Sequence, residues 1–396
     1  MPIRAAVLFL SCLLGASAAV AQTIVLQDRR GDDHGNGDLI YPNRDDLRPG
    51  DLDLVSVTAE PVKDGTLFKI EFGRAIRDPR GVVTQVGQIP MDRLARNGFY
   101  TFNVDLYIDT DRVAGSGKRH SVPGRGVEID RQFAWEKAIV LTPRPEVASS
   151  MLENQLLLAA EADLKAREGR VSKYRLEYIA GELKEETDSL YFFPSRARVA
   201  GKTVEFLVPD SFLPGPVSES WAFTVLVTGA DLEQAGPPVS GGPRRRAPMM
   251  TMGVALGITY DSFGIRSDVD SGVAPVIDLL SPVQGAQEAA LNDYDVVTPR
   301  LASVPGVAAD GKPATTPEGE ALTAEAAERL DAVTRGTAPA PVAGMPAASA
   351  APPPSAVSAQ PRTVAQRLRE LNQLLEDGLI TAEEHAELRR KILSEL

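Results

Sequence analysis

Residues 102–109 of the chain read Phe102-Asn103-Val104-Asp105-Leu106-Tyr107-Ile108-Asp109. Large apolar residues occupy every second position, and polar or amphipathic residues stand between them. Because successive side chains of a β-strand point to opposite faces of a sheet, this period of two predicts a strand with one face in a core and the other toward water. Asp105 and Asp109 are expected on the outward face.

Three further segments show the same alternation and predict additional half-buried strands. Their apolar positions are Phe68, Ile70 and Phe72, then Val204, Phe206 and Val208, then Trp221, Phe223, Val225 and Val227. Gly- and Pro-rich turns, such as 115–117, 123–124 and 214–216, punctuate the chain between such segments. Many short strands joined by turns of this kind favour a mainly β fold, an antiparallel β-sandwich, over a parallel α/β fold.

One segment within this region has a helical period instead. From Glu146 to about Arg167, apolar residues recur at intervals of three and four, and Gly169 is a suitable helix terminator. We expect a single inserted helix that covers a face or an edge of a sheet. Residues 173–187 remain ambiguous between a helix and a strand.

The N-terminus differs in composition from the β-rich region, which we place at residues 22–295. Arg4 precedes an uncharged apolar run, and Ala19-Val20-Ala21 is a small-x-small cleavage site, so residues 1–21 are expected to form a signal peptide. The protein is then exported, to the periplasm or outside the cell. The only cysteine, Cys12, gives the alternative of a lipoprotein, and the mature chain would have no disulfide.

The C-terminal quarter has a different composition again. Residues 296–361 are rich in Ala, Pro, Gly, Ser and Thr and predict a disordered linker, because they have little apolar surface to bury. Residues 362–396 show two apolar helical stripes around a stop at Asp377-Gly378, which predicts a small helical hairpin. Two helices this short are hardly stable alone, so we expect self-association through the hairpin.

Composition and motifs argue against several classes of function. The chain has 54 Asp and Glu against 42 Lys and Arg, and its net charge of −12 repels phosphate backbones, so nucleic acid is not an expected partner. It contains no G-x-S-x-G elbow, P-loop or H-E-x-x-H motif, and only three histidines. We therefore expect a protein that is not an enzyme.

Two acidic groups are candidate sites for calcium, a hard cation that takes six to eight oxygen ligands from pliable loops. In the Gly-rich stretch 28–38, the candidate ligands are Asp32, Asp33 and Asp38. In and after the strand quoted above, they are Asp105, Asp109 and Asp111. The alternative for both groups is a set of acidic turn formers with Asx hydrogen bonds.

Aromatic side chains near polar turns are candidate ligand-binding residues, because an amphipathic ring can stack on the apolar face of a sugar. We assign this role to Tyr41, Phe99, Tyr100 and Trp135. Trp221 continues an apolar strand face and is assigned to the core. A haem site is a further alternative, with axial ligands from His120 and from Met249, Met250 or Met252, although methionines of this kind also fill cores.

Several motifs together resemble the glucodextranase C-terminal domain family over residues 22–291. They are 31–37 with Tyr41-Pro42, 49–54, Asn97-Gly98-Phe99, 107–110, Pro123-Gly124-Arg125, 135–138, Val208-Pro209 with Phe212-Leu213, and 276–280. The resemblance implies a DOMON-like β-sandwich, related to family-nine carbohydrate-binding modules, with a binding or anchoring role. Where members of the family carry Asn-Pro-Trp, this chain has Asp78-Pro79-Arg80, and the helix at 146–167 looks like an insertion.

The C-terminal hairpin is similar to the SHOCT family through residues 374–384, which implies oligomerisation or attachment. The expected function is therefore an exported, non-catalytic module that binds carbohydrate or cell-envelope glycan. The alternatives are an envelope interaction or assembly protein with no small ligand, and a periplasmic haem-binding DOMON-like protein.

Overall fold

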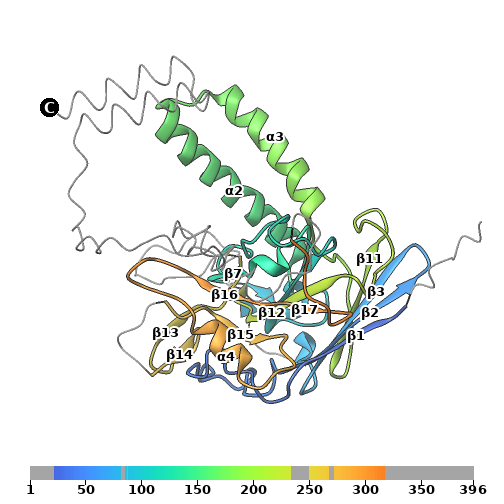
Figure 1. Ribbon diagram of the computed structural model, residues 1–396. Helices are drawn as coiled ribbons and strands as arrows, with labels where there is room; N and C mark the ends of the chain where they lie inside the picture. Colours follow the sequence, from blue (N-terminus) through green and yellow to red (C-terminus); the bar gives the residue numbers. More distant parts are fainter. Residues whose placement is uncertain (1–21, 82–84, 87, 233–248, 267–271, 317–396) are drawn as a thin grey trace, which may run out of the picture. The chain divides into compact units, whose positions relative to one another are not determined.

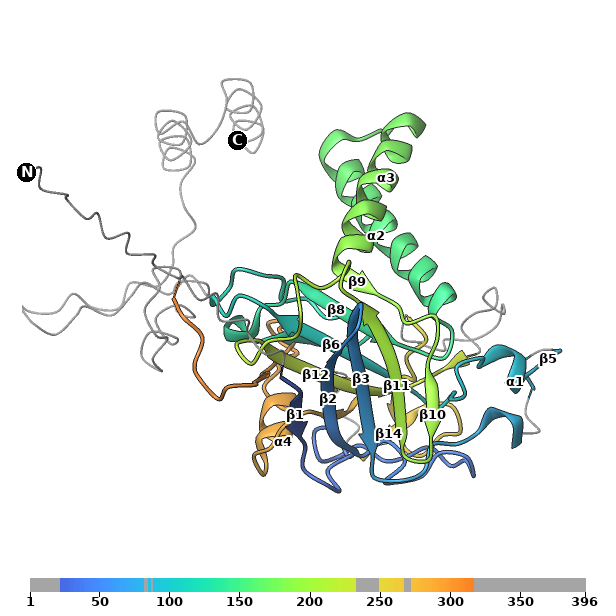
Figure 2. The same ribbon diagram turned by 90° about the vertical axis from the view of Figure 1, so that its right-hand side faces the viewer.

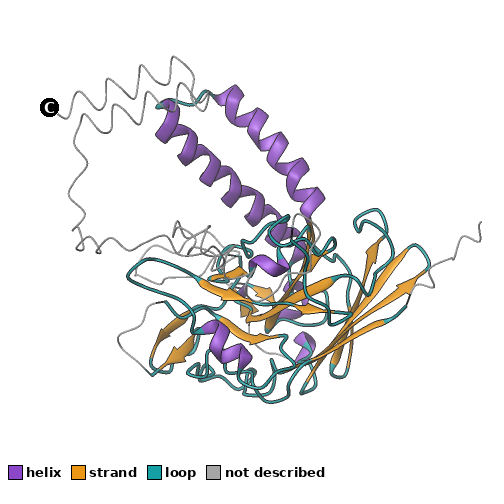
Figure 3. Ribbon diagram, in the orientation of Figure 1, coloured by secondary structure: helices purple, strands orange, loops and turns teal. Residues whose placement is uncertain are grey.

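The computed structural model describes residues 22–81, 85–86, 88–232, 249–266 and 272–316. All of these belong to one compact unit that ends at Thr337. The described part is mainly β, as Figure 3 shows. The signal peptide, most of the linker and the whole C-terminal hairpin lie outside the described residues and remain predictions.

The first large sheet has five antiparallel strands in the order β1-β2-β3-β11-β10. They are β1 (Ile24–Gln27), β2 (Leu54–Val62), β3 (Gly65–Phe72), β11 (Thr203–Pro209) and β10 (Arg198–Ala200). The alternation predicted for β3 and β11 is confirmed: Phe68, Ile70 and Phe206 are buried, and the residues between them are partly or fully exposed.

The second large sheet has six strands in the order β15-β12-β6-β8-β9, with β17 beside β12. They are β15 (Val276–Leu279), β12 (Ala222–Gly229), β6 (Phe102–Asp109), β8 (Lys137–Leu141), β9 (Tyr191–Phe192) and β17 (Val307–Ala308). Figure 2 shows the first sheet in front of the second. Apolar side chains of both sheets, such as Phe68 and Leu106, share one core, so the sandwich is confirmed.

A second apolar cluster covers the other face of the six-stranded sheet. It joins Tyr107 and Leu226 of the sheet to Leu152 of α2 (Pro145–Glu168) and to residues of β7 (Val127–Ile129) and β16 (Ala302–Val304). Every residue of β6 is therefore buried. The expected outward orientation of Asp105 and Asp109 toward water is wrong, because loops, a helix base and a small parallel strand pair cover that face.

The insertion is a pair of helices rather than a single helix. α2 is confirmed near its expected bounds and ends at Gly169, whose φ is 76°. Residues 173–187 form most of α3 (Lys173–Leu190), and the side chain of Ser172 caps its first turn. The two helices lie side by side and extend away from the sheets (Figures 1 and 2). Among the residues of α2 with described burial, Leu152 is the last that is fully buried and Leu156 still packs partly against the second cluster, so the N-terminal half of the helix covers the sheet.

The β-rich domain extends beyond its expected end at residue 295. β16 pairs in parallel with β7, and β17 pairs with β12. Ala302 and Val304 are 1% and 0% exposed. Residues 296–316, which we assigned to the linker, are thus part of the folded domain. Their small side chains insert into an existing core and need no aromatic residues of their own.

The remaining elements are short and lie around the sandwich. They are β4 (Gln85–Val86), β5 (Ile89–Pro90), α1 (Met91–Leu94), β13 (Val254–Leu256), β14 (Phe263–Ile265) and α4 (Ala286–Leu291), with 3-10 turns at Pro79–Gly81 and Arg131–Phe133. Within the described residues, no helix has the length and hydropathy needed to cross a bilayer.

Candidate functional site

A groove of about 920 Å³ lies between residues 40–49 and the turn that joins β13 to β14. Two backbone contacts hold these segments together. Ile40 and Gly264 exchange hydrogen bonds of 2.8 Å in both directions, and the backbone N–H of Asn43 donates to the carbonyl of Thr259 at 2.7 Å. The groove is therefore built on paired backbone, and its volume is in the usual range for small-molecule sites.

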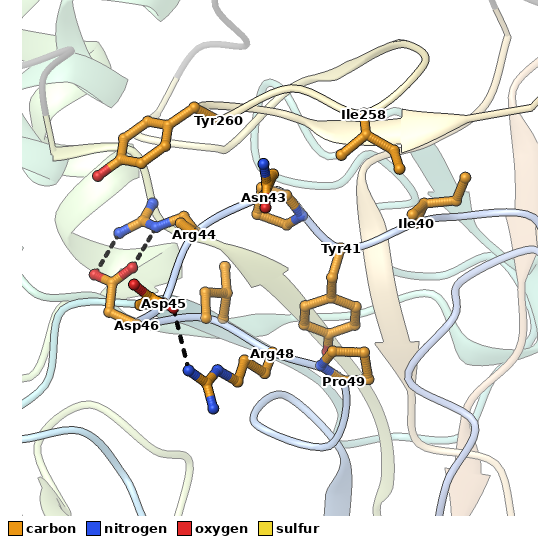
Figure 4. A pocket seen from close by; sticks show the side chains of 12 residues that line it. Ile40, Tyr41, Asn43, Arg44, Asp45, Asp46, Arg48, Pro49, Ile258 and Tyr260 are labelled. Atoms are coloured by element: carbon orange, nitrogen blue, oxygen red, sulfur yellow. Dashed lines mark hydrogen bonds and ion pairs between the residues drawn. The ribbon is translucent and has the colours of Figure 1, made fainter.

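The polar wall of the groove is a planar ion pair between Arg44 and Asp46 (Figure 4). The Nε and Nη2 atoms of Arg44 donate to the two carboxylate oxygens at 2.5 and 2.7 Å, and the hydroxyl of Tyr100 donates to Asp46 at 3.0 Å. Although burial opposes ionisation, these hydrogen bonds and the charge of Arg44 lower the pKa of the Asp46 carboxyl. The pair presents a flat, fully ionised fork.

The apolar part of the groove is contributed by exposed side chains. Tyr260 is 62% exposed and its ring lies 5.7 Å from the guanidinium carbon of Arg44. Ile258 is 65% exposed, and Figure 4 places it with Ile40 at the opposite end of the groove. An exposed ring beside a planar hydrogen-bonding fork suits a flat, amphipathic ligand.

The four aromatic residues expected to bind ligand are all buried, so none offers an open ring face for stacking, although Tyr41 is among the residues that line the groove. The hydroxyl of Tyr41 donates to Asp33, and its ring packs edge-on against Phe263 with centroids 5.4 Å apart. Phe99 stacks on Phe102, with 4.5 Å between centroids. Tyr100 offers only its hydroxyl, through Asp46. Polar neighbours in the sequence do not expose a ring when the turn folds back over the core.

The two tryptophans both belong to the core. Trp135 is 0% exposed, and its indole N–H donates to the carbonyl of His120 at 3.0 Å. Trp221 is 5% exposed, which confirms its assignment. The methionines considered as haem ligands, 249, 250 and 252, are also buried among core residues, as filler. The Nε2 atom of His120 lies 3.1 Å from the hydroxyl of Tyr191.

Of the three calcium ligands predicted in the acidic loop 28–38, only Asp32 lies in a cluster of carboxylates. Asp32 lies with Asp28 and Asp278, and their ligand oxygens are all within 4.8 Å of one another. Asp33 is instead bound to Tyr41 and to the backbone N–H of Gly50, and Asp38 is exposed. The loop packs on β15, where the N–H of Gly35 donates to the carbonyl of Ile277 at 2.8 Å.

The second predicted set also divides. Asp109 and Asp111 come together with Glu136, again with ligand oxygens within 4.8 Å of one another. Asp105 is not part of this group, because it forms a buried ion pair with Arg125. Glu136 follows Trp135 in the sequence, and no sequence motif identified it as a metal ligand.

Two residues that sequence reasoning missed have identifiable signals. Asp278 is the only charged residue in the apolar run 276–280. A carboxylate in such a run is expected to be buried, and a buried carboxylate needs a partner or a bound cation. Tyr260 belongs to the polar turn 259–262, and only the backbone pairing of that turn with residues 40–43 reveals it as part of a groove.

The domain that carries these sites matches a known family. Residues 23–306 match the family model described as the C-terminal binding module, SLH-like, of glucodextranase. This range includes the first large sheet, all strands of the second except β17, the groove and both acidic clusters. No curated protein matches the chain.

Proposed function

The chain belongs to the family of glucodextranase C-terminal binding modules, and from this premise we propose that it binds a neutral glycan in the groove between residues 40–49 and Tyr260, without cleaving it. The observation that carries the proposal is the exposed ring of Tyr260 beside the Arg44–Asp46 fork. A sugar ring has an apolar face for stacking and equatorial hydroxyls for a planar donor and acceptor pair.

The charge of the groove favours a neutral ligand. Each cation in its lining has a carboxylate partner: Arg44 pairs with Asp46, and Arg48 pairs with Asp45 at 3.2 Å. Neither arginine of the groove lining is therefore unpaired and available to bind a phosphate or a uronate. The net charge of −12 also repels polyanions at longer range. An uncharged α-glucan or a neutral stretch of envelope polysaccharide fits this balance.

The family description also supports a place of action. A binding module described as SLH-like favours association with the cell envelope. We propose export by the predicted signal peptide at residues 1–21, followed by attachment of the envelope glycan to the groove. N-terminal sequencing of the mature protein should begin at Gln22. A lipid-bearing start at Cys12 would replace this route with a lipoprotein.

The test is calorimetry of the purified full chain against α-glucan oligosaccharides and peptidoglycan fragments. Tyr260→Ala should abolish measurable binding, whereas Tyr174→Ala, at an 84% exposed position on α3, should leave affinity unchanged. A reducing-end assay on the same samples should show no product. Release of reducing sugar after stringent purification, or equal affinity of both variants, would contradict the proposal.

The insertion favours a second candidate, an interaction protein with no small ligand. α2 and α3 expose Leu158, Tyr174 and Tyr178 at 63%, 84% and 58%. Absence of binding to every glycan, together with capture of an envelope protein that depends on these three side chains, would favour this function over the first.

A further inference from the structure

Three carboxylates from distant parts of the domain meet at one edge of the sandwich. Asp28 directly follows β1, Asp32 lies in the turn after it, and Asp278 lies within β15. Their ligand oxygens are all within 4.8 Å of one another. The group therefore joins an edge strand of the first sheet to an edge strand of the second.

Backbone donors from both sheets hold this group in place. Asp278 is 0% exposed, and its carboxylate accepts from the N–H of Leu54 at 2.7 Å and of Leu279 at 2.8 Å. The Oδ1 atom of Asp28 accepts from the N–H of Ser281 at 2.7 Å. These contacts fix the carboxylates without neutralising them.

Two oxygens of the group have no partner among the described residues. The Oδ2 atom of Asp28 and the Oδ1 atom of Asp32 are both buried and accept no hydrogen bond. Burial and the charges of Asp32 and Asp53 raise the pKa of Asp28 to about 7. Burial and the charges of Asp53 and Glu288 raise the pKa of Asp32 to about 6. Burial and the charges of neighbouring carboxylates raise the pKa of Asp278 well above its usual value. Buried acceptors without a hydrogen-bond donor in a like-charged cluster are costly unless a cation or a bound proton compensates them.

The other acidic cluster shows that proximity alone does not mark a site. Asp109 accepts from the backbone N–H and the guanidinium of Arg112 at 2.7 and 3.1 Å. Glu136 accepts from the N–H and the hydroxyl of Thr110 at 2.8 and 3.2 Å. Burial raises the pKa of Asp109 as well, to about 6, so hydrogen-bond partners, rather than pKa, separate the two clusters. The second cluster is satisfied by the protein itself.

We propose that Asp28, Asp32 and Asp278 bind a calcium ion that fastens the two sheets together at their edges. The donors are all carboxylate oxygens, which favour a hard cation over zinc or copper, whose sites usually include imidazole or thiolate ligands. Calcium suits them better than magnesium, because it accepts irregular oxygen ligand sets, whereas magnesium demands a near-ideal octahedron. The observations that support this site do not rely on the glycan groove.

The test uses the full chain, stripped with a chelator, and calcium as the only added ligand. Calorimetry should show one site, and saturating calcium should raise the melting temperature by about 5 °C, because a ligand that binds only the native state stabilises it by mass action. Asp32→Asn and Asp28→Asn should each weaken binding at least tenfold. Asp111→Asn, in the satisfied cluster, should leave it unchanged.

The melting temperatures also separate a metal site from a cluster of shared protons. Without calcium, Asp32→Asn should melt at or above the parent protein, because it removes a repulsive charge. With calcium, it should melt below the parent, which alone gains the ion. Either no calcium binding by the folded parent, or variants that are more stable than the parent in both conditions, would overturn the proposal.

Discussion

The guanidinium of Arg125 forms a bidentate ion pair with Asp105, with Nε 2.5 Å from Oδ2 and Nη2 3.0 Å from Oδ1. Both side chains are 1% exposed. Arg125 also donates to the hydroxyl of Thr251, and Tyr107 donates to Asp105 at 3.3 Å. The pair ties the loop after β6 to the strand itself, on the face that the second core covers.

Breaking this pair from one side should be strongly destabilising. Arg125→Met leaves the Asp105 carboxylate buried without its compensating charge, so we expect the free energy of unfolding to fall by about 3–5 kcal/mol. Urea denaturation monitored by tryptophan fluorescence measures it. Combining Arg125→Met with Asp105→Leu should recover most of the loss, because no buried charge remains. A double variant as unstable as the single one would mean that the pair stabilises the fold outright.

The fork of Arg44 should matter for glycan binding beyond its charge. Arg44→Lys keeps the cation and loses the planar pair with Asp46, so we expect affinity to fall about tenfold, which corresponds to about 1.4 kcal/mol. The control is Arg198→Lys, because Arg198 lies on the edge strand β10 and pairs with Glu205 of the neighbouring strand β11. Calorimetry of both variants with the same oligosaccharide checks the prediction, and an unchanged affinity of Arg44→Lys would contradict it.

Removing calcium should weaken glycan binding as well as stability. Asp32 adjoins Asp33, whose carboxylate holds the Tyr41 hydroxyl and the N–H of Gly50 at 2.6 Å, on both sides of residues 42–49 that line the groove. A mobile Asp32 would loosen both anchors, so we expect a several-fold loss of affinity after chelation. In reverse, Tyr260→Ala should leave calcium affinity unchanged. Glycan affinity that is independent of calcium would show the groove to be rigid without the ion.

Two glycines of the acidic loop should differ in their tolerance of a side chain. A Cβ atom at Gly35 would lie 2.5 Å from the carbonyl oxygen of Val276 in β15, whereas one at Gly31 would meet nothing within 4 Å. Both residues have positive φ, 58° and 80°, which costs an alanine about 1–2 kcal/mol. Gly31→Ala should show this cost alone, and Gly35→Ala a larger one, measured by thermal unfolding. Equal costs would mean that the loop can move away from β15.

The outer part of the helical insertion should be dispensable for folding. Replacing residues 158–180 with a short Gly/Ser linker removes the outer turns of α2 and α3 and keeps Leu156, which packs against the second core, so the melting temperature should change little. Leu152→Ala, at a position 0% exposed in the second core, should cost about 2–5 kcal/mol. A collapse of stability on truncation would show that the helices support the sheets along their length.

The strands and their core faces could be predicted from the sequence alone. The alternation at Phe68, Ile70 and Phe72 and at 102–109 identifies which side chains share a face, because a strand has a fixed period of two. The helical period from Glu146 and the stop at Gly169 are equally local signals, set by backbone geometry within a few residues.

Only the tertiary structure decided what covers each face and which distant residues meet. The period of two predicts that Asp105 and Tyr107 lie on the face of β6 that points away from the sandwich core. That face is buried in part by β16, a strand near the end of the domain's sequence. Asp28 and Asp278 lie at opposite ends of the domain's sequence, and chain order carries no signal of their contact. Side-chain period is a property of one strand, whereas burial depends on every segment that packs against it, so the acidic cluster and the groove at Tyr260 arise only on folding.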